Sequence, residues 1–366
     1  MSSVPAPISF VGVLGPTASG KTRLGVSLAR QFSGEIISLD SRQLYCGLDL
    51  GTGKDLDEYA AAPGTTPVPY HLIDVAEPNE AFDLFRYLAL ARDTIRDVHR
   101  RGRLPIGVGG TTLYLKALLD DYRLEGRGST PAFRRDLELR TDDELLSLLA
   151  AKAPDIFARA DRTQRRRIIR ALEIARTRHT GQEEAPGLGQ ELPLRPLLLA
   201  PYYPRAELHA RIAARLDARL QAGLVAEVAR LHAQGVSWER LDFFGLEYRY
   251  VARHLTGALS LAEMRNQLLA RIRQFCRAQE IWFRKLEREG KVIYWIPGGD
   301  PGEAAHLVTS FLEEQPLPPP RLRLCEIYYG PRSGRPGATA AGTVARLPDG
   351  GYGKVWETGQ EQGSGD

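Results

Sequence analysis

The chain has 366 residues, of which 43% are apolar and 26% charged, and its net charge of +4 is only mildly basic. This composition is ordinary for a soluble globular protein, and the length favours a core with an insertion or a second domain. The three cysteines, Cys46, Cys276 and Cys325, lie far apart without a Cys-x-x-Cys pair, which argues against a disulfide framework and a structural zinc site.

The N-terminal sequence MSSVPAPISF has no basic region followed by a long apolar stretch, so we expect no signal peptide. No run of about 18 apolar residues occurs in the chain, so we expect no transmembrane helix and no membrane partner. These features together predict a cytoplasmic protein.

Five short apolar runs are typical of buried parallel strands. They are residues 8–14, 35–40, 104–109, 196–200 and 292–296. Helical patterns occupy 21–32, 82–101 and 111–119, and longer ones occupy 205–223 and 261–289. This alternation predicts an α/β fold with a P-loop NTPase-like parallel sheet core.

The alternation stops between residues 120 and 193, where the pattern is helical and shows no convincing strand. Stretches containing glycine and proline flank this segment. We therefore interpret 120–193 as a helical insertion domain, which divides the core into residues 1–119 and 194–315.

The tail, 316–366, is rich in proline, glycine and small residues, and we expect its last ten residues to be disordered. Residues 321–330 and the segments TVARL and GKVWE are predicted to form a small β appendage around the Asp349-Gly350 turn.

The stretch GPTASGKT follows the first predicted strand and opens the first predicted helix, which is the context of a P-loop. Its backbone N–H groups and the helix N-terminus favour a phosphate group. Lys21 can reach the outer phosphate, and the Thr22 hydroxyl can bind Mg²⁺. The predicted diphosphate-binding residues are Gly15, Pro16, Thr17, Ala18, Ser19, Gly20, Lys21 and Thr22.

Two further predicted strands end in polar residues. Asp40 follows the second strand, and ligands in open α/β sheets lie outside such strand ends. Its carboxylate can bind a metal or accept a proton, or it can simply cap a turn beside Ser41. Thr111 follows the strand 104–109, where its hydroxyl can donate to a phosphate oxygen or can cap the next helix.

The predicted insertion carries an arginine-rich segment that contains a single acid, Glu173. Such a helix face suits a nucleic-acid backbone, although a solvated, salt-bridged face is the alternative. The arginines are Arg162, Arg165, Arg166, Arg167, Arg170, Arg176 and Arg178. A second basic helix, 261–289, interleaves basic residues with Phe275, Trp282 and Phe283. The alternative is that its residues Leu268, Ile272, Phe275 and Trp282 face a core.

Taken in order, GPTASGKT, ISLDSRQLYCGLDLGTGK, PYHLIDV, LPIGVGGTTLYLKALLD and RRRIIRALEI resemble the tRNA dimethylallyltransferases. The resemblance covers about residues 8–297. It implies transfer of a dimethylallyl group from dimethylallyl diphosphate to N6 of adenine 37, beside the anticodon of tRNA. It also implies that pyrophosphate leaves and that Mg²⁺ assists. We expect the protein to be a monomer.

The resemblance further implies roles for individual residues. Asp40 would be the general base on the N6 amine, Thr111 would hydrogen-bond the bridging oxygen, and Lys21, Thr22 and Arg215 would hold the diphosphate and its metal. The insertion would bind the anticodon stem-loop. The implied tRNA-binding residues are Asp40, Ser41, Arg42, Gln43, Gln164, Arg165, Arg166, Arg167, Gly245, Arg273, Gln274, Arg277 and Gln279.

The chain departs from the family pattern in three places that belong to RNA recognition. These are Gly245-Leu246-Glu247-Tyr248, the block from Ile272 to Trp282, which lacks two threonines and one arginine, and Gln164, where the family has aspartate. The diphosphate and base motifs are intact, so the chemistry is better supported than the identity of the RNA.

Three other functions are compatible with a P-loop. An adenylate isopentenyltransferase shares the P-loop and the aspartate but needs no long basic insertion. A small-molecule kinase could use Asp74 as its metal-binding carboxylate, but no clear lid segment is present. A non-catalytic RNA-binding module has no need of intact Lys21, Thr22, Asp40 and Thr111.

Overall fold

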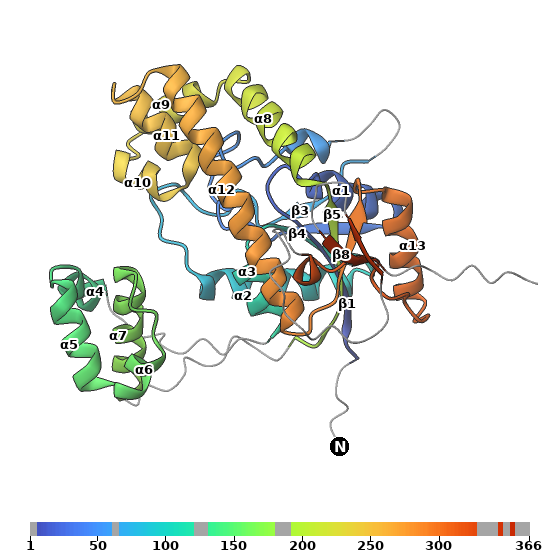
Figure 1. The fold of residues 1–366 in the computed structure, drawn as a ribbon, viewed down its shortest axis with the longest axis horizontal. Helices are drawn as coiled ribbons and strands as arrows, with labels where there is room; N and C mark the ends of the chain where they lie inside the picture. Colours follow the sequence, from blue (N-terminus) through green and yellow to red (C-terminus); the bar gives the residue numbers. More distant parts are fainter. Residues whose placement is uncertain are drawn as a thin grey trace, which may run out of the picture. The chain divides into compact units, whose positions relative to one another are not determined.

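The computed structural model describes residues 6–60, 66–120, 131–179, 192–327, 343–346 and 352–355. The chain divides into two compact units, one formed by residues 1–119 and 193–366 and the other by residues 120–192 (Figure 1). Each unit is described by itself below.

The first unit is built on a parallel sheet of six strands, which confirms the predicted α/β core. Its order is β3-β2-β4-β1-β5-β6, so the P-loop strand β1 lies at the centre between β4 and β5. Five strands match the apolar runs, because strands covered on both faces read as continuous apolar sequence. The strands are β1 Ile8–Leu14, β2 Gly34–Ser38, β3 Tyr70–His71, β4 Leu104–Gly109, β5 Leu194–Tyr202 and β6 Ile293–Pro297.

Helices cover both faces of this sheet. Val11 and Val13 of β1 pack in one apolar core with the helices α1 Lys21–Gln31 and α13 Pro301–Leu312. Side chains alternate along a strand, so Gly12 faces the other way, toward Leu115. That face carries α2 Leu84–Arg100 and α3 Thr112–Leu119, which are joined by stacked rings of Tyr87 and Tyr114.

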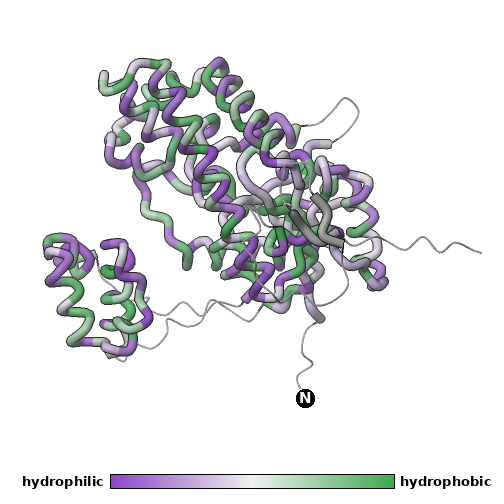
Figure 2. The backbone as a smooth tube through the Cα atoms, viewed as in Figure 1, coloured by the Kyte–Doolittle hydropathy of each residue, from purple (hydrophilic) through white to green (hydrophobic). Residues whose placement is uncertain are grey.

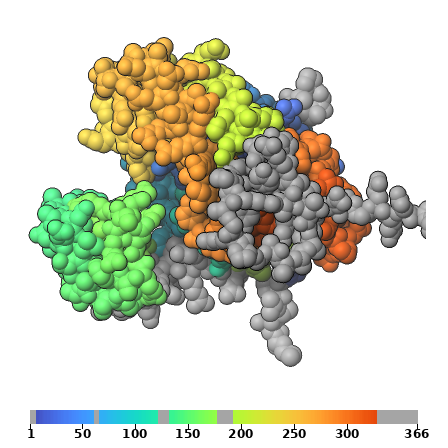
Figure 3. Space-filling model, viewed as in Figure 1, coloured from blue at the N-terminus to red at the C-terminus, as the bar shows by residue number. Residues whose placement is uncertain are grey.

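A layer of five helices extends from the carboxyl ends of the strands. The longest, α12, has 28 residues and begins at a capping box between Ser260 and Glu263. It packs against α8, α11 and α3, and Figure 3 shows it in orange on the surface beside the yellow-green α8. The five helices are α8 Arg205–Gln221, α9 Leu224–Ala233, α10 Trp238–Phe243, α11 Leu246–Leu255 and α12 Leu261–Arg288.

The second unit has its own apolar core, formed by residues such as Leu137, Leu149 and Ile169. Its described residues contain four helices and no strand. Polar and apolar residues alternate along these helices, as they do in the first unit (Figure 2). The helices are α4 Pro131–Glu138, α5 Asp142–Lys152, α6 Pro154–Arg159 and α7 Arg165–His179.

The tail contains an antiparallel pair, β7 Thr343–Arg346 and β8 Tyr352–Val355. The prediction of a strand over 321–330 is wrong for residues 321–327, where a 3-10 turn, η2 Leu324–Glu326, forms instead. The amides of Leu324 and Cys325 donate to the Glu287 carboxylate rather than to a neighbouring strand. Residues 328–330, the Asp349-Gly350 turn and the last ten residues lie outside the described part of the chain.

Two sequence expectations concern the membrane and the cysteines. None of the described helices is both long and apolar enough to cross a membrane. All three cysteines are free thiols, and burial raises the pKa of Cys276 to about 12.

Candidate active site

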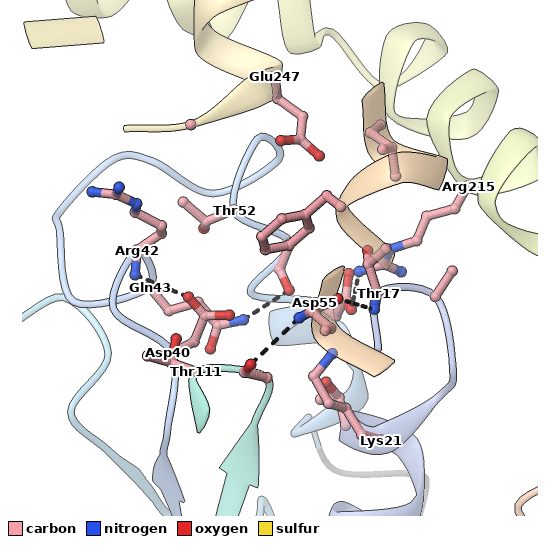
Figure 4. A pocket seen from close by; sticks show the side chains of 18 of the residues that line it. Thr17, Lys21, Asp40, Arg42, Gln43, Thr52, Asp55, Thr111, Arg215 and Glu247 are labelled. Atoms are coloured by element: carbon pink, nitrogen blue, oxygen red, sulfur yellow. Dashed lines mark hydrogen bonds and ion pairs between the residues drawn. The ribbon is translucent and has the colours of Figure 1, made fainter. Parts of the chain in front are cut away.

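A cavity of about 740 Å³ lies in the first unit at the carboxyl edge of its sheet. The P-loop, the ends of β2 and β4, the loop 51–55 and the helices α8, α11 and α12 contribute its walls. Figure 4 shows Lys21, Asp40, Thr111, Asp55 and Arg215 arranged around this space. Segments from far apart in the sequence therefore meet in one site.

The P-loop places part of its backbone on the cavity. Gly15, Ala18 and Gly20 have positive φ angles of 147°, 61° and 82°, and Gly20 precedes the first residue of α1. A Cβ atom on Gly15 would lie 2.5 Å from the Ser19 hydroxyl, so the turn requires glycine there. Of the eight predicted residues, five line the cavity: Thr17, Ala18, Gly20, Lys21 and Thr22. Gly15, Pro16 and Ser19 do not line it.

Lys21 is a cation at the P-loop end of the cavity. Its ammonium donates to the Pro16 carbonyl at 3.4 Å. Burial lowers the pKa of Lys21, the nearby Asp40 carboxylate raises it, and Arg215 lowers it. A partly desolvated cation beside exposed loop amides favours a dense anionic group such as a diphosphate.

Three arginines at spacing four on α8 add to this positive charge. Arg215 forms an ion pair with Asp55, and Arg219 lies 3.5 Å from Glu247. Burial, followed by the neighbouring Arg215, lowers the pKa of Arg219. The third, Arg211, donates from Nε to the Ala18 carbonyl at 3.0 Å. Sequence reasoning identified only Arg215, although the i, i+4 arginine stripe was a readable signal for the other two.

Gly53 allows the arginines to approach the loop 51–55. Its φ is 64°, and a Cβ atom there would lie 2.7 Å from the Arg215 guanidinium and closer still to that of Arg219. The second glycine of the GTGK stretch is therefore explained by this close approach, whereas a Cβ atom on the first, Gly51, would lie 2.4 Å from the Tyr248 ring.

Asp40 and Thr111 lie side by side where β2 and β4 end. The strands approach so closely that a Cβ atom on Gly109 would lie 2.3 Å from the Leu39 carbonyl. Asp40 Oδ1 accepts from the Arg42 amide at 2.9 Å, which is the turn-capping role. Among the described residues nothing donates to its other oxygen, and the side chain lines the cavity. One oxygen thus fixes the carboxylate while the other remains available.

The Thr111 hydroxyl is oriented by a bond to the β2 side. Its Oγ1 accepts from the Ser41 amide at 3.1 Å, rather than from an amide of α3. Because that bond uses a lone pair, the hydroxyl proton remains available to donate into the cavity.

Two glutamines predicted to bind RNA have hydrogen-bond partners within the protein. Gln43 Oε1 accepts from the Ser38 hydroxyl at 2.9 Å, and its Nε2 donates to the Gly53 carbonyl at 3.0 Å. Gln279 Oε1 accepts from the Thr17 amide at 2.9 Å. The amide groups of both residues thus stabilise the walls of the site, and their contact with RNA stays a prediction.

The remaining RNA-binding candidates of the first unit fall into two groups. Ser41, Arg42 and Gly245 line the cavity, and the Arg42 guanidinium stacks 4.5 Å from the Phe243 ring centre. Burial lowers the pKa of Arg42, and Asp40 raises it. Arg273, Gln274 and Arg277 lie on α12 and do not line the cavity.

Sequence reasoning missed the anchors of the loop 48–55. Lys54 has no exposed surface, and it binds Asp49 at 2.6 Å, Asp74 and the Tyr45 carbonyl. Asp74, the carboxylate that a kinase would need, is therefore paired with Lys54 and does not line the cavity.

Glu227 of α9 fastens the other side of this loop. Its carboxylate accepts from the amides of Asp49, Leu50 and Gly51 at 3.1, 2.7 and 3.1 Å. It also accepts from the Tyr248 hydroxyl at 2.8 Å. No local sequence pattern predicts this contact, because it joins segments far apart in the chain.

Aromatic side chains of α12 form an apolar wall. Phe275 and Trp282 are 50% and 44% exposed and line the cavity, so the alternative of a core position is wrong for both. Leu268 and Ile272 are buried, as that alternative required. The cavity therefore has a cationic end at the P-loop and an apolar wall on α12.

In the second unit, acids from outside the arginine-rich segment neutralise much of its charge. Arg165 pairs with Asp142 and donates to the carbonyls of Leu137, Glu138 and Arg140. The other pairings are Arg167 with Asp161, Arg170 with Glu173, and Arg176 stacked on Phe133. Glu173 is the single acid within the segment, but acids outside it, Asp142 and Asp161, also pair with its arginines. Arg166 is exposed and donates only to Gln164 among the described residues.

Family models and known proteins match most of this chain. A model of the IPP transferase family matches residues 43–286, more than half of the chain, and an isopentenyl transferase model matches residues 9–62. The tRNA dimethylallyltransferase 2 of Trichlorobacter lovleyi is 47% identical over 304 residues, 82% of this chain and 96% of that protein. The protein of that name from Citrifermentans bemidjiense is 47% identical over 286 residues, 78% of this chain and 90% of that protein.

Solved structures of tRNA prenyltransferases are also similar to this chain. The full-length tRNA isopentenylpyrophosphate transferase of Bacillus halodurans is 30% identical, with a TM-score of 0.60 over 84% of this chain and 97% of that one. A eukaryotic dimethylallyltransferase acting on tRNA, 24% identical with a TM-score of 0.71, covers 85% of this chain and shares its fold. With a family model over more than half of its length and relatives almost half identical to it, the chain belongs to the IPP transferase family, the family of the tRNA dimethylallyltransferases.

Proposed function

We propose that this protein transfers the dimethylallyl group of dimethylallyl diphosphate to N6 of adenine 37 in tRNA and releases pyrophosphate. The observation that carries the proposal is the juxtaposition of Asp40 and Thr111 at adjacent strand ends, opposite the cationic P-loop end of one cavity. A general base, a hydroxyl donor and an anion site are thus available to one reaction.

The diphosphate end supplies charge where the leaving group develops it. Breaking the allylic C1–O bond moves an electron pair onto the diphosphate. Lys21 and the arginines of α8 face that charge, and the Thr111 proton is available to the bridging oxygen. Fixed cations and donors of this kind stabilise the transition state without reorganising.

The acceptor side needs a base because an aromatic amine is a poor nucleophile. As the N6–C1 bond forms, N6 loses one proton, and Asp40 is the carboxylate placed to accept it. The apolar wall of Phe275 and Trp282 suits a prenyl chain or a stacked base. An adenine within an RNA loop would have to unstack to reach this point.

The residues present fit a Mg²⁺ ion that is bound mainly by the substrate. The Thr22 hydroxyl lines the cavity beside Lys21, whereas no described group of three or more His, Cys, Asp or Glu side chains could hold a metal. Mg²⁺ is commonly bound by few protein groups together with phosphate oxygens. When bound, it would supply further charge neutralisation at the diphosphate.

The second unit favours RNA over a free nucleotide as the acceptor. AMP, ADP or ATP would need only the cavity, whereas a separately folded helical unit with exposed arginines suits a polyanion. We propose the anticodon stem-loop as its partner. The protein is expected to act as a monomer, which sedimentation analysis would test.

The test is a labelling experiment with purified protein and dimethylallyl diphosphate that carries an isotope in the prenyl group. Bulk tRNA should become labelled, and the nucleoside recovered after digestion should be N6-dimethylallyladenosine. Label that appears only in added AMP or ADP would favour an adenylate isopentenyltransferase instead. Label in neither acceptor, with correctly folded protein, would refute prenyl transfer.

A further inference from the structure

Gln279 joins the helix α12 to the P-loop inside the first unit. Its side chain is 8% exposed, its Oε1 accepts from the Thr17 amide at 2.9 Å, and its Nε2 lies 3.4 Å from the Gly110 carbonyl. A Cβ atom on Gly110 would lie 2.6 Å from that Nε2. Glycine at position 110 therefore leaves the space that the glutamine occupies.

The part of the loop that Gln279 holds is conformationally strained. Ala18, the next residue, has a φ of 61°, which is unfavourable for a side chain with a Cβ atom. The carbonyl of Ala18 accepts from Arg211 of α8. Two side chains from the helical layer thus hold Thr17 and Ala18 in place, one on an amide and one on a carbonyl.

We propose that Gln279 is a positioning residue for the diphosphate site, through which α12 fixes the P-loop in its binding conformation. This inference rests on the proposed function and deepens it. The sequence resemblance implied that Gln279 contacts tRNA, whereas the hydrogen bonds place it on the donor side of the reaction.

The same helix face carries the apolar wall. Phe275 lies four residues before Gln279 and Trp282 three residues after it, so all three lie on one side of α12 and line the cavity. Gln279 therefore couples the position of the wall to that of the loop. A shift of α12 would alter both ends of the donor site together.

The chemistry at this position requires a neutral group that both accepts and donates. Methionine has a similar length but would leave the Thr17 amide and the Gly110 carbonyl without this partner. Glutamate would accept from Thr17 but would add a negative charge beside the loop that binds a diphosphate.

The test compares Gln279→Met with Gln267→Met, a glutamine on the exposed side of the same helix. We would measure the Kd of inorganic pyrophosphate with Mg²⁺ by calorimetry, the KM for dimethylallyl diphosphate, kcat, and the Kd of tRNA. Gln279→Met should raise the pyrophosphate Kd and the donor KM about tenfold, the order expected for a lost hydrogen bond that leaves its partner unpaired. The tRNA Kd should stay within about twofold, and Gln267→Met should match the natural protein.

A second variant tests the contact from the loop side. In Gly110→Ala the added methyl group would lie 2.6 Å from the Gln279 amide nitrogen and 3.3 Å from the Gly15 carbonyl. It therefore displaces the Gln279 amide from the loop, and the same loss of pyrophosphate affinity is expected.

Two results would overturn the inference. A raised tRNA Kd with unchanged pyrophosphate binding would make Gln279 an RNA contact. Tighter pyrophosphate binding in Gln279→Met would show that Gln279 competes with the diphosphate for the Thr17 amide. If the natural protein transfers no prenyl group but Gln279→Met still loses pyrophosphate affinity, the proposed function fails while the role of Gln279 stands.

Discussion

The hydrogen bond between Ser41 and Thr111 joins residues 70 positions apart in the chain. It holds the two strand ends so that a carboxylate and a hydroxyl enter the cavity together. The sequence predicted Asp40 and Thr111 as site residues, because each follows an apolar run that is typical of a strand. It could not predict that Gln43 and Gln279 bind the protein itself, since a motif identifies a residue but not its partner.

We expect Asp40→Asn to lower kcat by about 10² to 10⁴, the usual contribution of a general base. Asparagine keeps an oxygen that can accept from the Arg42 amide, so the local turn should persist. Single-turnover prenyl transfer and a tRNA filter-binding assay would measure the two effects separately. Turnover near the natural rate would remove Asp40 as the base.

Thr111 allows a matched pair of substitutions. Thr111→Val removes the hydroxyl at nearly constant volume and should lower kcat about 10²-fold, the order seen for a lost donor to a developing negative charge. Thr111→Ser keeps the hydroxyl and should retain most of the activity. Equal losses in both variants, measured under saturating donor, would contradict a hydrogen bond to the leaving oxygen.

Glu35 gives a prediction about pH. It lies buried beside Arg101, whose Nη2 is 2.8 Å from it, and beside His71. The hydrogen bond from Arg101 lowers the pKa of Glu35 below the ordinary value of 4.5, burial opposes this, and His71 lowers the pKa further. The folded state therefore binds this proton more weakly than the unfolded state does. The resulting stability is fully present above about pH 4.5 and is lost as the pH falls through the lower folded pKa.

The measurement is the melting temperature between pH 3 and 7 for the natural protein and for Glu35→Gln. The variant should be less stable near neutral pH, and the difference should shrink as the pH falls below about 4.5. Asp57→Asn, at an exposed carboxylate, provides the control. A difference that stays constant over this range would contradict the assignment.

Among the elements, the five apolar strands and the long helices agree with the sequence to within two residues at each end. Strands covered on both faces have continuous apolar sequence, and amphipathic helices have apolar residues at helical spacing, so both can be predicted from sequence. The strand β3 escaped prediction because its two residues, Tyr70 and His71, are polar and lie at the sheet edge. The loop 48–55 escaped because Lys54 and Glu227 stabilise it through contacts that no local pattern contains.

The contact between η2 and α12 is an element-scale case of the same kind. Glu287 is 1% exposed and accepts from Trp295 Nε1 at 2.8 Å and from the amides of Leu324 and Cys325 at 3.2 and 2.7 Å. Glu287→Ala would leave three donors unpaired, so we expect a loss of about 2–5 kcal/mol in unfolding free energy.

Urea unfolding followed by circular dichroism measures this loss for the variant and the natural protein. Glu313→Ala, at an exposed site on the following helix end, is the control and should change stability by less than about 0.5 kcal/mol. A similar midpoint for both variants would show that the segment 323–327 contributes little to stability.

At the scale of the whole molecule, the chain combines a catalytic unit with a separately cored helical unit. The sequence indicated this division because the strand–helix alternation stops and helical periodicity replaces it. It overestimated the free positive charge of α7, since the pairing acids stand elsewhere in the sequence, at Asp142 and Asp161. The folded unit therefore distinguishes structural arginines from those available to RNA.

Arg165 and Arg166 are adjacent in sequence but should behave differently. Arg165 links three carbonyls near the end of α4 to α7, so Arg165→Ala should destabilise the helical unit and weaken tRNA binding through lost structure.

Arg166 is exposed with one weak partner, so Arg166→Glu should leave the melting temperature nearly unchanged. If it faces an RNA phosphate, this reversal should weaken tRNA binding and lower the slope of log K against log salt by about 1. Binding titrations at several salt concentrations, beside thermal melting of both variants, separate the two effects. An unchanged slope in Arg166→Glu would place the RNA on another face of the unit, because a lost phosphate contact must release one counterion fewer.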